Sequence, residues 1–239
     1  MGGRGGTSGI TAAPAPTAAA PMTTPSGHTL AEVQAMDDKE LHDFLIDVYN
    51  VDTPDFLNTH HTQKMVYGLG LNDKPQVVSD AQLQQMIKAG ATPIYRSVDD
   101  ITLPGSVVMT GGDMLDQLRH GDLTYLGDGR LGDGLYFSDS RSGSKMYGHT
   151  TIQGILSPNA KVISKQQLSN EYDQYIKTLP QTRKALGFSA QRGSKGWKNS
   201  LSQFALIRGY NVISEKQRGN ETYYNVIDRS ALIVSDKNQ

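Results

Sequence analysis

The chain has no cysteine among its 239 residues, which excludes disulfide bonds, thiolate nucleophiles and zinc–thiolate sites. No apolar run approaches the roughly 18 residues that a membrane-spanning helix needs. An excess of one charge is also missing. The formal net charge is −1 at pH 7, so bulk electrostatics predict no attraction to nucleic acid or to an anionic membrane. The first residues include a single arginine, Arg4, and no apolar segment, so no secretory signal is recognisable.

Composition divides the chain into three parts. Residues 1–27 are mostly Gly, Ala, Pro, Thr and Ser, which predicts a disordered arm. Residues 28–90 are expected to form a helical N-terminal region, because capping boxes begin at Thr29 and Asp37 and apolar residues follow at helical spacing as far as Val48. Residues 91–239 mix strand and helix patterns, so the fold class is α+β.

The individual elements follow from turn residues, caps and periodicity. We expect strands over 92–98, 106–110, 135–137, 151–156, 160–163, 210–214, 223–227 and 231–234, and helices over 80–88, 114–118, 167–179 and 200–208.

The most informative stretch is 132–148, Gly-Asp-Gly-Leu-Tyr-Phe-Ser-Asp-Ser-Arg-Ser-Gly-Ser-Lys-Met-Tyr-Gly. Its central residues read as a short strand, in which alternation places Leu135 and Phe137 on a core face. Gly134, Tyr136 and Ser138 then share the opposite face, which is aromatic and hydroxylated.

A second tyrosine and a hydroxyl complete this pattern. Tyr147 comes eleven residues after Tyr136, with Ser144 between them. Two aromatic planes and a hydroxyl suit a flat ligand that carries an amide. The alternative is a buried edge strand with a structural tyrosine, followed by a serine-rich loop.

The stretch resembles the nicotinamide-pocket segment of the ADP-ribosyltransferase superfamily, in particular its poly-ADP-ribose-polymerase-like branch. That branch carries a Gly-x-Gly-Ile-Tyr-Phe-Ala-Asp strand and a Ser-Lys-Ser-Ala-x-Tyr segment with the same spacing between tyrosines. The resemblance implies a split β-sheet core that binds NAD. It implies that Tyr136 and Tyr147 sandwich nicotinamide, that Ser144 bonds its amide, and that Gly134 and Ser138 belong to the same site.

An arginine precedes this stretch in the order the superfamily uses. Ile94-Tyr95-Arg96-Ser97 resembles the Tyr-Arg-Gly strand of the Arg-type branch, which implies that Arg96 and Ser97 help to bind NAD. A guanidinium makes planar, bidentate bonds to a phosphate or a ribose edge. The alternative for Arg96 is a surface charge at the end of a strand.

The third motif allows two alignments. The polymerase-like branch supplies its catalytic glutamate from an Asn-Glu-Tyr-Ile-Val-Tyr-Asp strand, which resembles residues 220–228 here. Matching Asn-Glu places Glu221 in the catalytic position, whereas matching the final Asp places Tyr223 there. We expect Glu221, and a tyrosine at this position would favour NAD binding without catalysis.

Together these motifs predict an ADP-ribosyltransferase that moves ADP-ribose from NAD to a protein side chain, with catalytic residues Arg96, Tyr136 and Glu221 and without a metal. The alternatives are NAD hydrolysis, or a structural protein that keeps the fold without turnover. The segments 67–75, 205–210 and 228–234 resemble phage-encoded members. This resemblance implies a location in the cytoplasm of a bacterial host or in a virion, with capsid or other virion proteins as further partners. We expect neither a membrane nor a nucleic-acid partner.

Overall fold

The computed structural model describes residues 28, 30–37, 40, 74–103, 105–121, 127–129, 131–178, 201–202, 204–206, 208–217 and 219–239. The arm expected over 1–27 and the apolar helical pattern that ends at Val48 lie outside the described residues.

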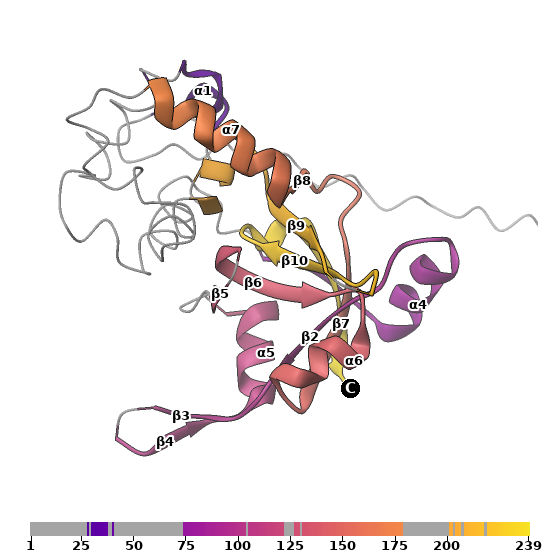
Figure 1. Ribbon diagram of the computed structural model, residues 1–239. Coiled ribbons are helices and arrows are strands. Elements are labelled where there is room, and N and C mark those ends of the chain that lie inside the picture. The colour runs from indigo at the N-terminus through magenta and orange to yellow at the C-terminus, as the bar shows by residue number, and fades with distance from the viewer. Residues whose placement is uncertain are drawn as a thin grey trace, which may run out of the picture.

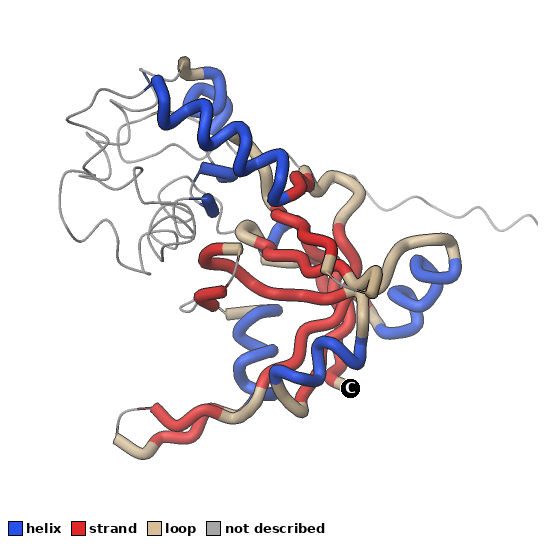
Figure 2. The backbone as a smooth tube through the Cα atoms, viewed as in Figure 1, coloured by secondary structure: helices blue, strands red, loops and turns tan. Residues whose placement is uncertain are grey.

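The described part is a mixed α/β structure built on one large, mostly antiparallel sheet with few helices (Figures 1 and 2). The strands are β1 (Gln76–Val78), β2 (Ile94–Val98), β3 (Ile101–Leu103), β4 (Val107–Met109), β5 (Gly127–Gly129), β6 (Gly132–Ser138), β7 (Thr150–Leu156), β8 (Val162–Ser164), β9 (Val212–Lys216), β10 (Thr222–Val226) and β11 (Leu232–Asn238). The helices are α1 (Leu30–Ala35), α4 (Asp80–Lys88), α5 (Gly111–Arg119), α6 (Arg141–Ser144) and α7 (Lys165–Thr178), with short 3-10 helices η2 (Lys145–Tyr147) and η3 (Arg229–Ala231).

The strand order of the main sheet is β1-β11-β7-β2-β6-β10-β9-β8, and β5 pairs with β6 outside this path. The pairs β1–β11 and β8–β9 are parallel, and the other pairs are antiparallel. Strands β3 and β4 form a separate hairpin that projects from the body of the molecule (Figure 1). The central strands β2 and β6 therefore come from segments about forty residues apart in the chain.

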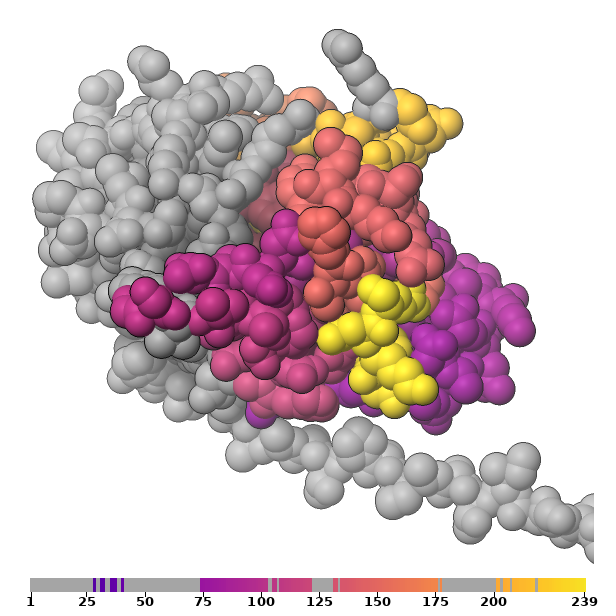
Figure 3. Space-filling view, turned by 90° about the horizontal axis from the view of Figure 1, so that it is seen from below, coloured from indigo at the N-terminus to yellow at the C-terminus, as the bar shows by residue number. Residues whose placement is uncertain are grey.

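Helices on the sheet bury its apolar side chains. Leu115 and Leu118 of α5 join a core cluster with Leu135 and Phe137 of β6, as the alternation in that strand predicted. On the other side of β11, Leu83 of α4 packs in a smaller cluster with residues of β7 and β11. Figure 3 shows the end of β11 at the surface between α4 and α5. These contacts hold the strand that carries Tyr136 against a rigid core.

The expected fold class is confirmed at this level, and most expected elements exist with shifted ends. Helix α4 matches the expected 80–88, since Ser79 and Gln82 form its capping box. The sequence reading missed three short strands, β1, β3 and β5. Strand β1 pairs with β11, so the sheet begins inside the segment 28–90 that we expected to be helical. Three residues are too few to show a period, and only the pairing partner makes them a strand.

Gly134 of β6 has a packing role that its motif did not indicate. A Cβ at Gly134 would lie 1.8 Å from Oδ1 of Asn225, which faces it from β10 and is fully buried. The Asn225 amide donates to the carbonyl oxygens of Leu131 and Gly132 at 3.1 and 3.4 Å. The missing side chain therefore makes room for an amide that ties β10 to the start of β6.

Gly134→Ala should lower the free energy of unfolding by about 1–3 kcal/mol, because the new methyl group forces the buried Asn225 side chain to move. Gly112→Ala is the matched control. It lies in α5, and its Cβ would meet nothing closer than 3.5 Å. Chemical denaturation of both variants checks this prediction, and equal stability of the two would contradict it.

Candidate functional site

The site lies where the sheet splits. Strands β2 and β6 are paired only through Tyr95 and Ser138, whereas β2 pairs with β7 along its whole length. Between the diverging strands lies a cavity of about 560 Å³, a size typical of small-molecule sites. The lining residues are Tyr95, Arg96, Ser97, Val98, Asp99, Ile101, Met114, Leu131, Tyr136, Phe137, Ser138, Ser144, Tyr147, Glu215, Gln217 and Tyr223.

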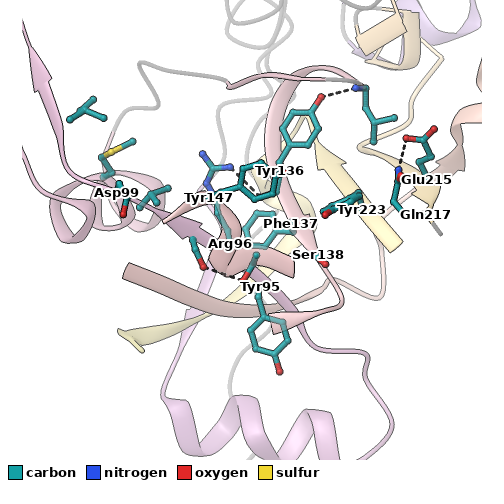
Figure 4. Close-up of a pocket in the computed structure, with 16 residues that line it drawn as sticks. Tyr95, Arg96, Asp99, Tyr136, Phe137, Ser138, Tyr147, Glu215, Gln217 and Tyr223 are labelled. Atoms are coloured by element: carbon teal, nitrogen blue, oxygen red, sulfur yellow. Dashed lines mark hydrogen bonds between the residues drawn. The ribbon is translucent and has the colours of Figure 1, made fainter. Parts of the chain in front are cut away.

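Arg96 crosses the split from β2. Its Nη1 donates to the carbonyl oxygen of Tyr136 on β6 at 3.1 Å. Figure 4 shows the arginine in the middle of the lining residues, close to Tyr136 and Tyr147. This bond holds the guanidinium at the split, among the residues that line the cavity, and a guanidinium is a group that binds an anion or a ribose edge.

Tyr136 is held at its far end. Its hydroxyl donates to the carbonyl oxygen of Gly132 at 2.6 Å and accepts from the backbone N–H of Leu131 at 2.8 Å. Because both bonds go to the backbone at the start of β6, the ring is fixed in one orientation against the cavity. A fixed ring loses little conformational entropy when a flat ligand stacks on it.

Ser144 is a buried hydroxyl in the same cavity, with 3 % of its surface exposed. Its Oγ donates to the carbonyl oxygen of Arg141 at 2.9 Å and lies 3.1 Å from Oγ of Ser97, which in turn lies 2.8 Å from Oγ1 of Thr151. A hydroxyl has one proton, so Ser144 offers a ligand only its lone pairs. It is therefore suited to accept a hydrogen bond from an amide N–H.

Tyr147 is the last residue of η2, three residues after Ser144. Its surface is 64 % exposed although it lines the cavity. Helix α6 positions this segment, and its N-cap Ser140 accepts from the N–H of Gly143 at 3.0 Å. An exposed ring at a cavity offers apolar area that a flat ligand can cover.

Glu221 lies at the margin of the cavity, just before β10. Oγ of Ser138 donates to its Oε1 at 2.6 Å. Its carboxylate also packs directly on α6, since a Cβ at Gly143 would lie 1.7 Å from Oε1. Glu221 thus reaches the cavity through Ser138 and is not itself among the described lining residues.

Tyr223, two residues after Glu221 in the chain, does line the cavity. Burial, together with the charges of Tyr147 and Glu221 and hydrogen bonds with them, raises the pKa of Tyr223 to about 12. The phenol is therefore neutral at physiological pH. Glu221 and Tyr223, the two candidates from the third motif, therefore lie at one site, and the tyrosine faces the cavity.

The sequence reading missed the acidic residues of the cavity, Asp99 and Glu215. Asp99 accepts at Oδ1 from the backbone N–H of His149 at 2.9 Å, and Nδ1 of the same histidine lies 2.6 Å away. Strand β9 ends at Lys216, two residues beyond the expected 214, which brings Glu215 into the sheet. The apolar Val212 and Ile213 were the available signal, and the polar residues that follow them led the sequence prediction to end the strand two residues too early.

Six of the eight expected site residues line this one cavity: Arg96, Ser97, Tyr136, Ser138, Ser144 and Tyr147. Gly134 is not among the described lining residues, and its Cα faces the side chain of Asn225. Among the described residues no group of three His, Asp or Glu could hold a metal ion. In the same part of the chain, no helix combines the length and the apolar character that crossing a membrane requires.

Comparisons with known proteins add little to this picture. No protein-family model matches the chain, and no match was found among curated proteins. A solved structure described as "Crystal structure of an anti-CRISPR protein" aligns with 61% of this chain and 94% of its own, at 11% identity and a TM-score of 0.32. A score of that size does not establish a common fold, so the function is argued from the site.

Tyr223 predicts a specific response to alkaline pH. Its pKa is higher in the folded chain than the ordinary 10.0, so its contribution to stability is complete below about pH 10 and disappears as the pH rises through about 12. Wild type should therefore lose more stability than Tyr223→Phe over this range. Urea denaturation at a series of pH values measures this difference, and phenolate absorbance gives an independent titration. Parallel stability profiles would contradict the raised pKa.

Proposed function

We propose that this chain is an NAD-dependent ADP-ribosyltransferase with a split-sheet core of the kind found in that superfamily. The observation that carries the proposal is the gathering of Arg96, Tyr136, Ser144 and Tyr147, which come from four elements, in a single cavity. Their chemistry matches the parts of NAD: two aromatic rings for nicotinamide, a hydrogen-bond acceptor for its amide, and a guanidinium for a phosphate or ribose.

The reaction requires little of the protein beyond positioning and charge. The bond between C1′ of the ribose and the nicotinamide nitrogen breaks, and nicotinamide leaves as a neutral molecule with the electron pair. A lone pair of the acceptor side chain forms the new bond to C1′, and the acceptor loses a proton. The Glu221 carboxylate, held by Ser138 beside the tyrosines, is suited to stabilise the positive charge that develops at the ribose.

A second function competes with transfer: NAD binding without turnover, in a structural or virion-associated protein. Tyr223 favours it, because a neutral phenol lines the cavity where the alternative alignment places the catalytic glutamate. A phenol donates or accepts hydrogen bonds but supplies no negative charge at neutral pH. The proposed acceptor is a protein in either a bacterial cytoplasm or a virion, and the two functions differ in whether this acceptor becomes labelled.

Labelled NAD separates these functions. Wild-type protein incubated with labelled NAD and a bacterial lysate should release nicotinamide and label discrete protein bands. Glu221→Gln should still bind NAD, while transfer falls by about 100-fold or more because the charge at the margin of the cavity is removed. Equal turnover by both proteins would remove Glu221 from the mechanism. Nicotinamide release without labelled bands would indicate hydrolysis, and NAD binding with neither signal would indicate the non-catalytic protein.

Gly143→Ala tests the same carboxylate without changing its charge. The new methyl group would lie 1.7 Å from Oε1 of Glu221, so the carboxylate must leave Ser138. The end of a flexible side chain moves at little cost, so we expect a folded protein that binds NAD and transfers ADP-ribose at least about tenfold more slowly. Lys145→Ala, an exposed change in the adjoining η2, is the control. Thermal unfolding together with the labelling assay measures both effects, and unchanged labelling by Gly143→Ala would contradict them.

A further inference from the structure

Glu215 occupies a defined place in the sheet next to the cavity. It lies opposite Tyr223 in the pairing of β9 with β10, and Tyr223 lies opposite Ser138 in the pairing of β10 with β6. The three residues form a row across neighbouring strands and all line the cavity. Strands are about 4.8 Å apart, so the backbone of Glu215 is about 10 Å from that of Ser138.

The carboxylate of Glu215 is held on both oxygens. Lys165, the first residue of α7, donates from Nζ to Oε1 at 3.0 Å, and Gln217 donates from Nε2 to Oε2 at 2.9 Å. The side chains of Lys165 and Glu215 are 22% and 16% exposed, so this is a half-buried pair rather than a flexible surface contact. Figure 4 shows Glu215 and Gln217 side by side at one end of the lining, beyond Tyr223. Such support fixes a carboxylate for binding.

The chemistry of NAD restricts what this carboxylate can bind. A phosphate is repelled by it, and the proposed function gives the nicotinamide ring to Tyr136, Tyr147 and Ser144, which lie outside this row. The remaining polar groups of NAD that donate hydrogen bonds include the ribose hydroxyls, and a carboxylate accepts two neighbouring hydroxyls at once. The position and the charge of Glu215 therefore point to a sugar.

We propose that Glu215 binds the neighbouring hydroxyls of a ribose of NAD, with Lys165 and Gln217 as positioning residues. This inference rests on the proposed function, since it assumes that NAD occupies the cavity. It assigns the two carboxylates beside Tyr223 different tasks. Glu221, next to Ser138, acts on the charge that develops in the reaction, and Glu215 holds the substrate.

Calorimetric titration with NAD tests this assignment. Glu215→Gln should weaken NAD binding by about tenfold or more, because charged hydrogen bonds to the hydroxyls are lost. Glu171→Gln is the matched control: it removes the same charge from α7, where Gln167 donates to that carboxylate, and lies outside the described lining of the cavity. The control should bind NAD as wild type does.

Lys165→Met separates binding from a structural role. It breaks the same ion pair as Glu215→Gln but keeps the carboxylate, which Gln217 still holds, so it should weaken NAD binding clearly less than Glu215→Gln does, even where both variants lose thermal stability. Equal losses of affinity in Lys165→Met and Glu215→Gln would overturn the proposal, because the ion pair and not the carboxylate would then be responsible.

Two further probes identify the ribose. Titration with nicotinamide mononucleotide and with adenosine monophosphate presents each half of NAD alone, and Glu215→Gln should weaken one of them. If Glu215→Gln binds NAD and both halves as tightly as wild type does, the role of Glu215 is overturned. The proposed function is still intact in that case, provided that wild type binds NAD and Tyr147→Ala weakens this binding. Absence of NAD binding by wild type overturns both.

Discussion

The site depends on a single constraint, the pairing of β2 and β6 through Tyr95 and Ser138 alone. On either side of that pair the strands continue in separate ladders, β2 with β7 and β6 with β10. The backbone groups near the split therefore need other partners. Arg96 supplies one by donating to the carbonyl oxygen of Tyr136. The gap that results is lined by side chains instead of being closed by a ladder.

Around this gap the hydrogen bonds fix side chains from distant segments. The hydroxyl of Tyr136 is tied to the backbone at Gly132, and Ser144 is tied to Ser97 and to the first residue of its own helix. Two glycines allow close approach: Gly134 admits the amide of Asn225, and Gly143 admits the carboxylate of Glu221. In both cases a missing side chain makes room for a polar group. Preorganisation of this kind suits a site that binds a rigid ring and stabilises charge.

Tyr223 bears most directly on whether the cavity is suited to catalysis or only to binding. It lines the cavity between two carboxylates, Glu221 before it in the chain and Glu215 opposite it in the next strand. Its raised pKa keeps the phenol neutral at physiological pH, so the negative charge beside it comes from the glutamates. A transferase and an inactive binder with this fold would differ mainly in how near those carboxylates come to the ribose.

The sequence alone determined the local features. Alternation placed Leu135 and Phe137 in the core, and capping residues located α4, because these depend on neighbours a few residues away. The motif around Tyr136 also indicated which polar residues belong to one site. Tertiary structure decided what pairing brings together: β1 as a strand, Gly134 as the neighbour of Asn225, and Glu215 as part of the cavity. These contacts join residues far apart in the chain, and strand register, which local pattern does not specify, sets them.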